Sequence, residues 1–187
     1  MRIVAGQWRG RRLVAPRGDI ARPTADRVRE AWMSIVTPWL AGARVLDLFA
    51  GSGALGIEAL SRGAASADFV ENAAPSITAI GENLASVGVG DEARVHRGDA
   101  LKFIARLDAH AYDVAFADPP YDRGLAEQVA AQWLVTPFAE VLGVEHRAFE
   151  KMPAGGERRK YGGTAITFYR FVTEEREASD GFPRSRE

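Results

Sequence analysis

Four consecutive residues, Asp118-Pro-Pro-Tyr121, combine groups that could recognise a ligand. They follow the apolar run 112–117, which has the composition of a buried β-strand, so they stand just past its carboxyl end. In open α/β sheets this edge is where ligands bind. The proline carbonyls and the Asp118 carboxylate accept hydrogen bonds, and the Tyr121 ring offers a flat stacking surface. This set suits a planar ligand with an exocyclic amine, such as a nucleobase. The alternative is a proline-rich turn that only ends the strand.

A glycine-rich turn containing Gly51, Gly53 and Gly56 follows another apolar run and opens a helical pattern. Glycine allows the backbone to turn tightly and to approach a ligand closely. With Glu71 about 20 residues further on, the spacing also matches the dinucleotide fingerprint, so the glycines alone fit a nicotinamide cofactor equally well. Asp47 adds information, because a carboxylate inside an apolar strand end requires a hydrogen-bonding partner. The spacing Asp-x-Phe-x-Gly-x-Gly resembles the first motif of class I methyltransferases.

Acidic residues end four predicted strands in turn, at Asp47, Glu71, Asp99 and Asp118. Their spacing of about 20 to 28 residues matches one strand–helix unit per acid and predicts a parallel α/β sheet. Glu71 is placed to accept both ribose hydroxyls of an adenosine, and Asp99 to accept the adenine amine. A single acid at a strand end is often a helix N-cap, and for Asp99 the two interpretations weigh equally.

Composition limits the classes of protein that the chain can belong to. The 187 residues are 47% hydrophobic, enough for one domain with a sizeable core. The chain has no cysteine, which excludes disulfides, a thiol nucleophile and cysteine-ligated metals. Its three histidines lack metal-ligand spacing, and no apolar run approaches the ~18 residues that span a membrane. We therefore expect no metal and no membrane contact, and a cytoplasmic monomer.

A net charge of −1 hides a basic amino-terminal segment. The first 30 residues hold eight arginines against three acids, a net +5, which leaves 16 basic and 22 acidic residues elsewhere. The strand-like segments 2–5 and 11–15 predict a β-hairpin outside the α/β body. A basic arm of this kind is typical of phosphate binding, and the alternative is a solvated face. We expect a basic hairpin and linker at 1–23, one domain at 24–173 and a disordered tail at 174–187.

The remaining elements follow from periodicity. Thr24 can N-cap a helix that runs to about Leu40, with Asp26 favourably placed in its first turn. The helical spacing of apolar residues predicts that Trp32 and Trp39 belong to the core rather than to a base-stacking surface. Further helices are expected at 53–62, 75–87, 100–108 and 123–134, a fifth strand at 146–151, and an antiparallel pair at 158–161 and 164–172.

Four segments together resemble one family, the bacterial 16S rRNA guanine-N2 methyltransferases of the small ribosomal subunit. They are the hairpin 6–13, the Arg-Pro-Thr signature at 22–30, the glycine loop and helix at 47–63, and Asp118-Pro-Pro-Tyr121. The first two are specific to that family, whereas the last two are shared with many methyltransferases. The resemblance implies a class I methyltransferase, Rossmann-like α/β fold. Its seven-stranded sheet would be mostly parallel with an antiparallel last strand, extended by an N-terminal β-hairpin.

The resemblance also implies a cofactor, S-adenosylmethionine, and a partner, 16S rRNA within the small subunit or an assembly intermediate. Asp118, Pro119 and Tyr121 would be catalytic: the first two accept hydrogen bonds from the guanine amine, and Tyr121 receives the base. The implied cofactor-binding residues are Asp47, Ala50, Gly51, Gly53, Glu71, Asn72, Asp99, Ala100 and Asp118. The implied RNA-binding residues are Arg9, Arg11, Arg12, Arg22, Thr24, Arg27 and Arg29. No site residue after the fifth strand is implied.

Three other functions fit parts of the sequence. An amino-methyltransferase acting on DNA adenine or a protein glutamine would use Asp118-Pro-Pro-Tyr121 equally well. A nicotinamide-dependent oxidoreductase fits the glycine spacing, but it leaves Asp47 and Asp118 without a role. A non-catalytic ribosome-binding protein would keep the basic arm without needing the complete set of strand-end acids.

Overall fold

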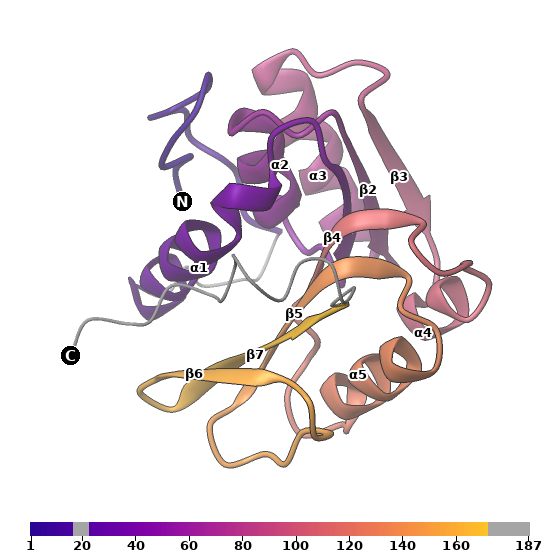
Figure 1. The fold of residues 1–187 in the computed structure, drawn as a ribbon. Helices are drawn as coiled ribbons and strands as arrows, with labels where there is room; N and C mark the ends of the chain where they lie inside the picture. Colours follow the sequence, from indigo (N-terminus) through magenta and orange to yellow (C-terminus); the bar gives the residue numbers. More distant parts are fainter. Residues whose placement is uncertain (17–22, 172–187) are drawn as a thin grey trace.

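The apolar runs of the sequence form a central seven-stranded sheet (Figure 1). The computed structural model describes residues 1–16 and 23–171, apart from the side chains of residues 23–25. The strands are β1 (Arg44–Leu48), β2 (Ser66–Glu71), β3 (Ala93–Arg97), β4 (Tyr112–Ala117), β5 (Ala139–Arg147), β6 (Glu157–Tyr161) and β7 (Thr164–Arg170). Their order across the sheet is β3-β2-β1-β4-β5-β7-β6.

One strand of this sheet, β7, runs against the others. It pairs antiparallel with β5 on one side and with β6 on the other. The other neighbouring strands pair in parallel. The predicted mostly parallel sheet with an antiparallel last strand is therefore confirmed.

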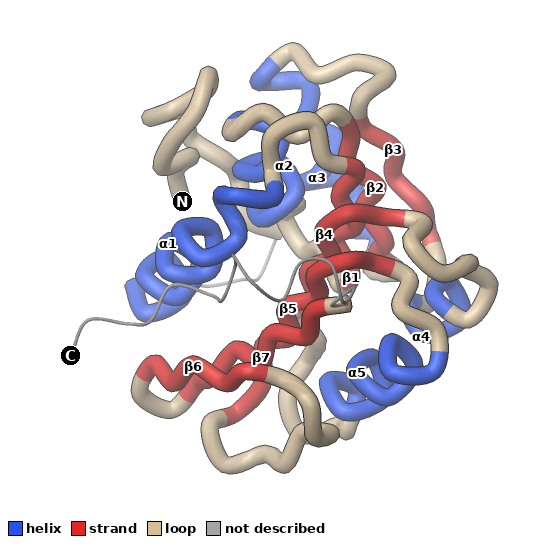
Figure 2. The backbone as a smooth tube through the Cα atoms, in the orientation of Figure 1, coloured by secondary structure: helices blue, strands red, loops and turns tan. Residues whose placement is uncertain are grey.

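Helices cover both faces of the sheet (Figure 2). They are α1 (Pro23–Val36), α2 (Ala54–Ser61), α3 (Ala74–Val87), α4 (Ala100–Ile104) and α5 (Leu125–Val135), with a short 3-10 helix, η1 (Thr37–Trp39), after α1. Successive strand residues point to opposite faces. Accordingly, Val45 packs in the core shared with α1, α2 and α3, whereas Leu46 packs in the core shared with α4 and α5.

Trp32 of α1 anchors that helix on the sheet. Its side chain is buried, and its ring meets Phe116 and Phe168 edge-on at centroid distances of 5.6 and 6.4 Å. A side chain on Gly143 of β5 would lie 2.4 Å from the indole nitrogen, so the close approach requires glycine there. Trp39 packs against the same core. The prediction of a core residue is confirmed for Trp32, whereas Trp39 is half-buried at the edge of the core, with the Arg170 guanidinium 5.1 Å from its ring centroid.

Three predicted boundaries are wrong. Helix α1 begins at Pro23, so Thr24 lies in its first turn rather than at its N-cap. The fifth strand was placed at 146–151, but β5 spans Ala139–Arg147 and the chain turns immediately afterwards. A glycine within a strand weakens its sequence signal, and Gly143 sits in the middle of β5 because Trp32 packs on it. The helix expected at 100–108 ends at Ile104. The predicted tail at 174–187 lies outside the described residues.

The amino-terminal segment 1–16 is a hairpin-shaped loop rather than two regular strands. A single bridge pairs Arg2 with Arg12, while Ile3 and Leu13 are buried in the core shared with α2 and α3. The predicted hairpin extension is therefore present as a turn, but its position outside the body was wrong. Because these two side chains belong to the core, the segment packs as part of the α/β body.

Candidate active site

Asp118 lies directly after the carboxyl end of β4, beside the carboxyl end of the neighbouring central strand β1. Its side chain is exposed, and its backbone N–H faces the Leu48 carbonyl of β1 at 3.5 Å. Pro119, the next residue, is buried. The chain leaves β1 toward β2 on one side, while β4 lies on the other, so this is the switch point at which α/β sheets bind ligands. Asp118-Pro-Pro-Tyr121 thus starts beside the strand that leads into the glycine loop.

Tyr121 is fixed by residues of β5 and β7. Its hydroxyl donates to Glu145 Oε1 at 2.6 Å and lies 3.2 Å from Thr164 Oγ1. Burial, followed by the hydrogen bond to Glu145, raises the pKa of Tyr121, and burial likewise raises the pKa of Glu145. The Arg147 guanidinium lies 4.8 Å from the ring centroid. The ring is therefore locked in orientation, with a cation over one face.

Sequence reasoning missed Glu145, Arg147 and Thr164 as part of this site. The signal was available in the rule that located the other strand-end acids, because Glu145 and Arg147 stand at the carboxyl end of β5. Because the sequence predicts this strand at 146–151, its true carboxyl end was not recognised and no site residue was assigned there.

The glycine loop 49–53 is held in shape by a left-handed glycine at its end and by the side chain of Glu71. Gly53 has a φ of 75°, a left-handed conformation that favours glycine, and it is the N-cap of α2. The Gly51 N–H donates to Glu71 Oε2 at 2.9 Å, which ties the loop to the end of β2. Ala50, the second residue of the loop, is buried. The predicted cofactor residues of these elements therefore lie together.

Asp47 lies under the glycine loop rather than on its surface. The carboxyl group is buried, and Oδ2 accepts a hydrogen bond from the Gly56 N–H at 2.9 Å. Burial raises the pKa of Asp47 to about 8, against a smaller opposing effect of that hydrogen bond. The expected hydrogen-bonding partner is thus the first turn of α2, and Asp47 fixes where that helix begins.

Glu71 serves three backbone amides at once. Besides Gly51, its carboxylate accepts from Asn72 N at 2.8 Å and from Ala73 N at 2.9 Å. A carboxylate has about four acceptor positions, so about one remains for a ligand. The Asn72 side chain is exposed beside it.

Asp99 caps a helix, as one of its two interpretations predicted. Its Oδ1 accepts from Lys102 N at 2.8 Å at the start of α4, and Ala100, the first helical residue, is buried. The Asp99 side chain is exposed, so capping leaves its second oxygen facing outward for further bonding.

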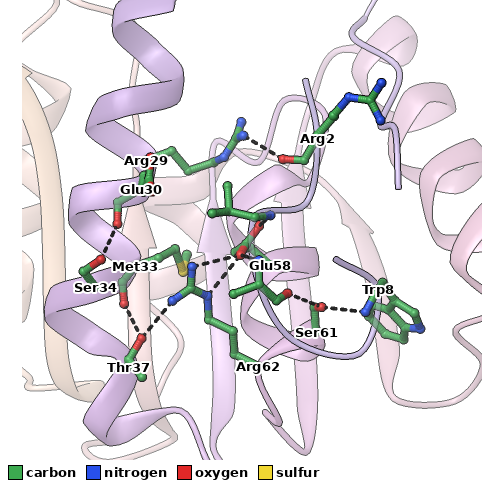
Figure 3. A network of polar contacts seen from close by, with 12 residues as sticks. Arg2, Trp8, Arg29, Glu30, Met33, Ser34, Thr37, Glu58, Ser61 and Arg62 are labelled. Carbon is green, nitrogen blue, oxygen red and sulfur yellow. Dashed lines mark hydrogen bonds and ion pairs between the residues drawn. The ribbon is translucent and has the colours of Figure 1, made fainter. Parts of the chain in front are cut away.

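A buried carboxylate, Glu58 of α2, holds the amino-terminal segment (Figure 3). Its oxygens accept from Val4 N and Ala5 N, each at 2.9 Å, and pair with Arg62 at 3.0 Å. Ser61 Oγ extends the network, donating to the Ala5 carbonyl and accepting from Trp8 N (Figure 3). The amides of residues 4 and 5 therefore bond to a helix side chain, which explains why no regular strand forms there.

Asn83 of α3 connects this segment to the glycine loop. Its side chain is buried and bonds both the N–H and the carbonyl of Val14, at 2.8 and 3.0 Å. The same amide donates to the Ser52 carbonyl at 2.9 Å. The amino-terminal segment and the predicted cofactor loop thus share one side chain.

The predicted RNA-binding arginines differ in their surroundings. Arg9, Arg12 and Arg27 are exposed, and Arg11 is exposed but donates to the Ser86 carbonyl at 2.7 Å. Arg29 is turned inward instead, donating to the Arg2 carbonyl at 3.0 Å (Figure 3) and pairing with Asp26 at 3.1 Å. Arg22 and the side chain of Thr24 lie outside the described residues.

The described residues contain no cluster of three or more histidines, aspartates or glutamates arranged to hold a metal ion. Within the same part of the chain, no helix has the length and apolar character that crossing a membrane requires.

Comparison with known proteins identifies the family. The model of the family described as Conserved hypothetical protein 95 matches residues 1–170. The chain belongs to this family. A curated relative, the Ribosomal RNA small subunit methyltransferase D of Escherichia coli K12, is 44% identical over 128 residues, which are 68% of this chain and 64% of that protein. The match confirms the resemblance to small-subunit rRNA methyltransferases, although it spans slightly less than two thirds of the relative's length.

Solved structures of similar proteins share the fold across nearly their whole length. The structure named "Putative methyltransferase yhhF", from Escherichia coli, is 36% identical with a TM-score of 0.79, covering 91% of this chain and 97% of the other. The hypothetical protein TTHA0928 of Thermus thermophilus is 33% identical with a TM-score of 0.77, covering 91% and 99%. The class I methyltransferase fold inferred for this family member is confirmed.

Proposed function

We propose that this protein transfers a methyl group from S-adenosylmethionine to the exocyclic N2 amine of a guanine in 16S rRNA of the small ribosomal subunit. The observation that carries the proposal is the position of Asp118, exposed at the end of β4 and beside the end of β1, from which the glycine loop begins. The name of the Escherichia coli relative supports the ribosomal RNA substrate.

The residues around the glycine loop fit S-adenosylmethionine. Gly53 opens α2 in a left-handed conformation, which lets the backbone approach a ligand. Glu71 keeps about one acceptor position for a ribose hydroxyl, and exposed Asp99 has an oxygen for the adenine amine. When bound, this cofactor supplies an electrophilic methyl group on a positively charged sulfur, which leaves as a neutral thioether.

Asp118 and the Pro119 carbonyl are the residues that activate the amine. The lone pair of a guanine amine is delocalised into the ring, so it is a weak nucleophile. Acceptors for its two N–H groups favour a pyramidal nitrogen and direct the lone pair at the methyl carbon. The nitrogen–carbon bond forms as the carbon–sulfur bond breaks, and the extra proton then leaves the nitrogen for solvent. Positioning and electrostatics supply most of the acceleration.

Tyr121 provides the surface that receives the base once it has left its stack. Its hydroxyl is held by Glu145 and Thr164, so the ring keeps one orientation without the substrate. The exposed arginines Arg9 and Arg12 provide charge for phosphates, which position the RNA rather than specify its bases.

The sheet order argues against a nicotinamide-dependent oxidoreductase. The dinucleotide-binding fold has the strand order 3-2-1-4-5-6 in parallel. Here the antiparallel β7 is inserted between β5 and β6. The glycine spacing that fits both cofactors therefore occurs in a sheet that departs from that fold.

Incubation with labelled S-adenosylmethionine tests the proposal. Small subunits, naked 16S rRNA, DNA and total protein are offered as separate substrates, and the label is mapped along the acceptor. We expect label in 16S rRNA, and calorimetric binding of S-adenosylmethionine but not of nicotinamide dinucleotides. Label confined to DNA or protein, or binding of a nicotinamide dinucleotide in its place, would contradict the proposal.

A further inference from the structure

An aromatic side chain is exposed at the edge of the candidate active site. Phe149 lies in the turn 147–152, directly after β5, and 76% of its surface is exposed. Single exposed apolar side chains are common on protein surfaces, so it is the place of Phe149 beside the proposed catalytic segment, rather than its exposure alone, that points to a role.

The turn itself is firmly held. Arg147 and Glu150 close it reciprocally: Arg147 N donates to Glu150 Oε2 at 2.6 Å, and Glu150 N donates to the Arg147 carbonyl at 3.0 Å. Ala148 N donates to the Gly163 carbonyl at 2.9 Å, and the Arg158 guanidinium donates to the carbonyls of Ala148 and Glu150. Phe149 is therefore presented outward from a fixed backbone, bonded on both sides.

The same turn is joined to the proposed catalytic segment. Arg147 pairs with Asp122 at 2.9 Å, and its guanidinium covers one face of the Tyr121 ring at 4.8 Å. Phe149 is thus two residues from a side chain that touches the aromatic surface proposed for the target base. Phe149 follows the carboxyl end of β5, and Asp118 follows the carboxyl end of the parallel neighbour β4, so both stand at the same edge of the sheet.

The segments next to Phe149 in the chain and at the end of β4 carry charges of both signs, including Glu150 in the turn and Asp122 after Tyr121. Lys151 is exposed in the turn, and Arg123 is exposed after Asp118-Pro-Pro-Tyr121. A hollow of about 140 Å³ separates the turn from the start of α5, with Glu150, Lys151 and Met152 on the side of the turn. Small-molecule sites usually exceed about 300 Å³, so the hollow carries no separate ligand, but it leaves this flank of the turn uncovered. An exposed aromatic ring offers a stacking face to any nucleobase, and the exposed Lys151 and Arg123 supply charge for phosphates.

We propose that Phe149 enters the RNA at the position that the target guanine leaves, and stacks on the neighbouring base. This inference rests on the proposed function, because a guanine must leave its stack before its amine can reach Asp118. Inserted apolar side chains compensate the stacking that a displaced base loses. Phe149 is then a positioning residue, which stabilises the displaced state without touching the reacting atoms.

Three variants test the inference on small subunits with saturating S-adenosylmethionine. Phe149→Ala removes the ring, and Phe149→Trp keeps an aromatic surface. Val135→Ala is the matched control, since Val135 is 79% exposed but lies at the far end of α5, away from the carboxyl edge of the sheet. The measurements are the single-turnover methylation rate, the affinity for the subunit and the affinity for S-adenosylmethionine.

We expect Phe149→Ala to lower methylation efficiency by about 5- to 150-fold, the range for stacking one base on an aromatic ring. Phe149→Trp should stay within about 3-fold of the parent, and Val135→Ala should be unchanged. Cofactor affinity should be the same in all four proteins, which a general folding defect would not allow. The tryptophan of Phe149→Trp should also lose fluorescence when subunits bind, relative to the parent with its four tryptophans.

Several outcomes overturn the inference. They are a Phe149→Ala variant within two-fold of an active parent, a Phe149→Trp variant as impaired as Phe149→Ala, or no change in fluorescence. A parent dimer that Phe149→Ala converts to a monomer with unchanged methylation would assign the ring to a second copy of the chain instead. A parent that methylates no RNA would reject the proposed function itself, a result distinct from all of these.

Discussion

Asp118 and Glu71 are acids at the ends of two strands that both flank β1, yet their surroundings give them different roles. Glu71 is surrounded by three backbone amides, two of them from the chain that follows β2 and one from the glycine loop. Asp118 is exposed, and its neighbour Pro119 has no N–H to offer. The carboxylate of Glu71 therefore shapes the glycine loop, whereas the exposed carboxylate of Asp118 is the one we propose for the substrate amine.

Replacing Asp118 by Ala should abolish most activity. The acceptor is useful chiefly in the transition state, so turnover should fall by a factor on the order of 10² or more while cofactor affinity changes little. The measurements are methylation rates on small subunits and calorimetry with S-adenosylmethionine. Asp113→Ala is the control, since Asp113 stands near the opposite end of β4, where it pairs with Arg44. A methylation rate of Asp118→Ala within a few-fold of the parent rate would contradict the role proposed for Asp118.

Replacing Glu71 by Ala should weaken S-adenosylmethionine binding by ~1.5–3 kcal/mol, the range for hydrogen bonds to a charged acceptor. Turnover at saturating cofactor should change much less. Titration calorimetry gives the affinity directly, with Glu82→Ala, an exposed acid of α3, as the control. Unchanged affinity in Glu71→Ala would mean that the carboxylate only ends its strand.

At the scale of elements, the amino-terminal segment is a structural part of the domain as well as a carrier of charge. It provides two core side chains, Ile3 and Leu13, and two amides to the buried Glu58. Sequence reasoning recognised its turn and its arginines, but not where it packs. The missing information is tertiary, because nothing in the sequence shows that Glu58 of α2 replaces a partner strand.

Deleting residues 1–15 should therefore destabilise the fold, contrary to expectation from the sequence. The loss of Ile3 and Leu13 removes two buried side chains, each of the kind that costs about 2–5 kcal/mol when truncated to Ala. It also strips the buried Glu58 of two donors. The midpoint temperature of thermal unfolding should fall by at least about 10 °C. A deletion variant that melts with the parent would show that the segment is dispensable.

A second variant tests the charge of the segment without deleting its backbone. In it, Arg9, Arg11 and Arg12 are changed together to Ala. It should melt close to the parent, because these side chains are exposed. RNA binding should weaken and become less salt-sensitive, each lost phosphate contact reducing the slope of log affinity against log salt by roughly 0.7–0.9. Arg11 already bonds the Ser86 carbonyl, so about two contacts rather than three should be lost. A parental affinity and salt slope would exclude these arginines from docking.

The sequence located β1 and β4 because each is largely apolar and ends just before or at an acidic residue and a turn. The strand that it misplaced, β5, contains Gly143, whose presence only the packing of Trp32 explains. That single error removed Glu145 and Arg147 from the predicted site. The strand-end acids were predictable because the carboxyl ends of parallel strands meet at one edge, whereas the clamp on Tyr121 depends on the antiparallel β7.

At the scale of the whole molecule, two buried groups give folding stability opposite dependences on pH. The pKa of Asp47 is raised from 3.8 to about 8, so the folded chain keeps a proton that the unfolded chain releases. The contribution of Asp47 to the free energy of unfolding is complete below pH 3.8 and is lost as the pH rises to about 8. Burial lowers the pKa of His146 below 6.5, so its contribution is present above that pH and lost as the pH falls.

Replacing Asp47 by Asn should remove the pH dependence of stability that comes from Asp47 and leave the one that comes from His146. Asn can accept the Gly56 N–H but cannot ionise. The stability of Asp47→Asn relative to the parent should therefore increase with pH between 5 and 7, by up to about 1.4 kcal/mol per pH unit. His146 is common to both proteins, so its contribution cancels. Denaturant unfolding at several pH values measures the difference, and a constant difference would show that Asp47 is ionised when buried.

The identity of the methylated nucleoside tests the central claim most directly. Small subunits are incubated with the protein and labelled S-adenosylmethionine, and the purified 16S rRNA is digested to nucleosides and separated with standards. The account predicts label in N2-methylguanosine, and its loss when Asp118→Ala replaces the parent protein, because we propose that Asp118 and the Pro119 carbonyl accept hydrogen bonds from the guanine amine. Label in N6-methyladenosine, on a ribose hydroxyl or in no nucleoside at all would contradict it.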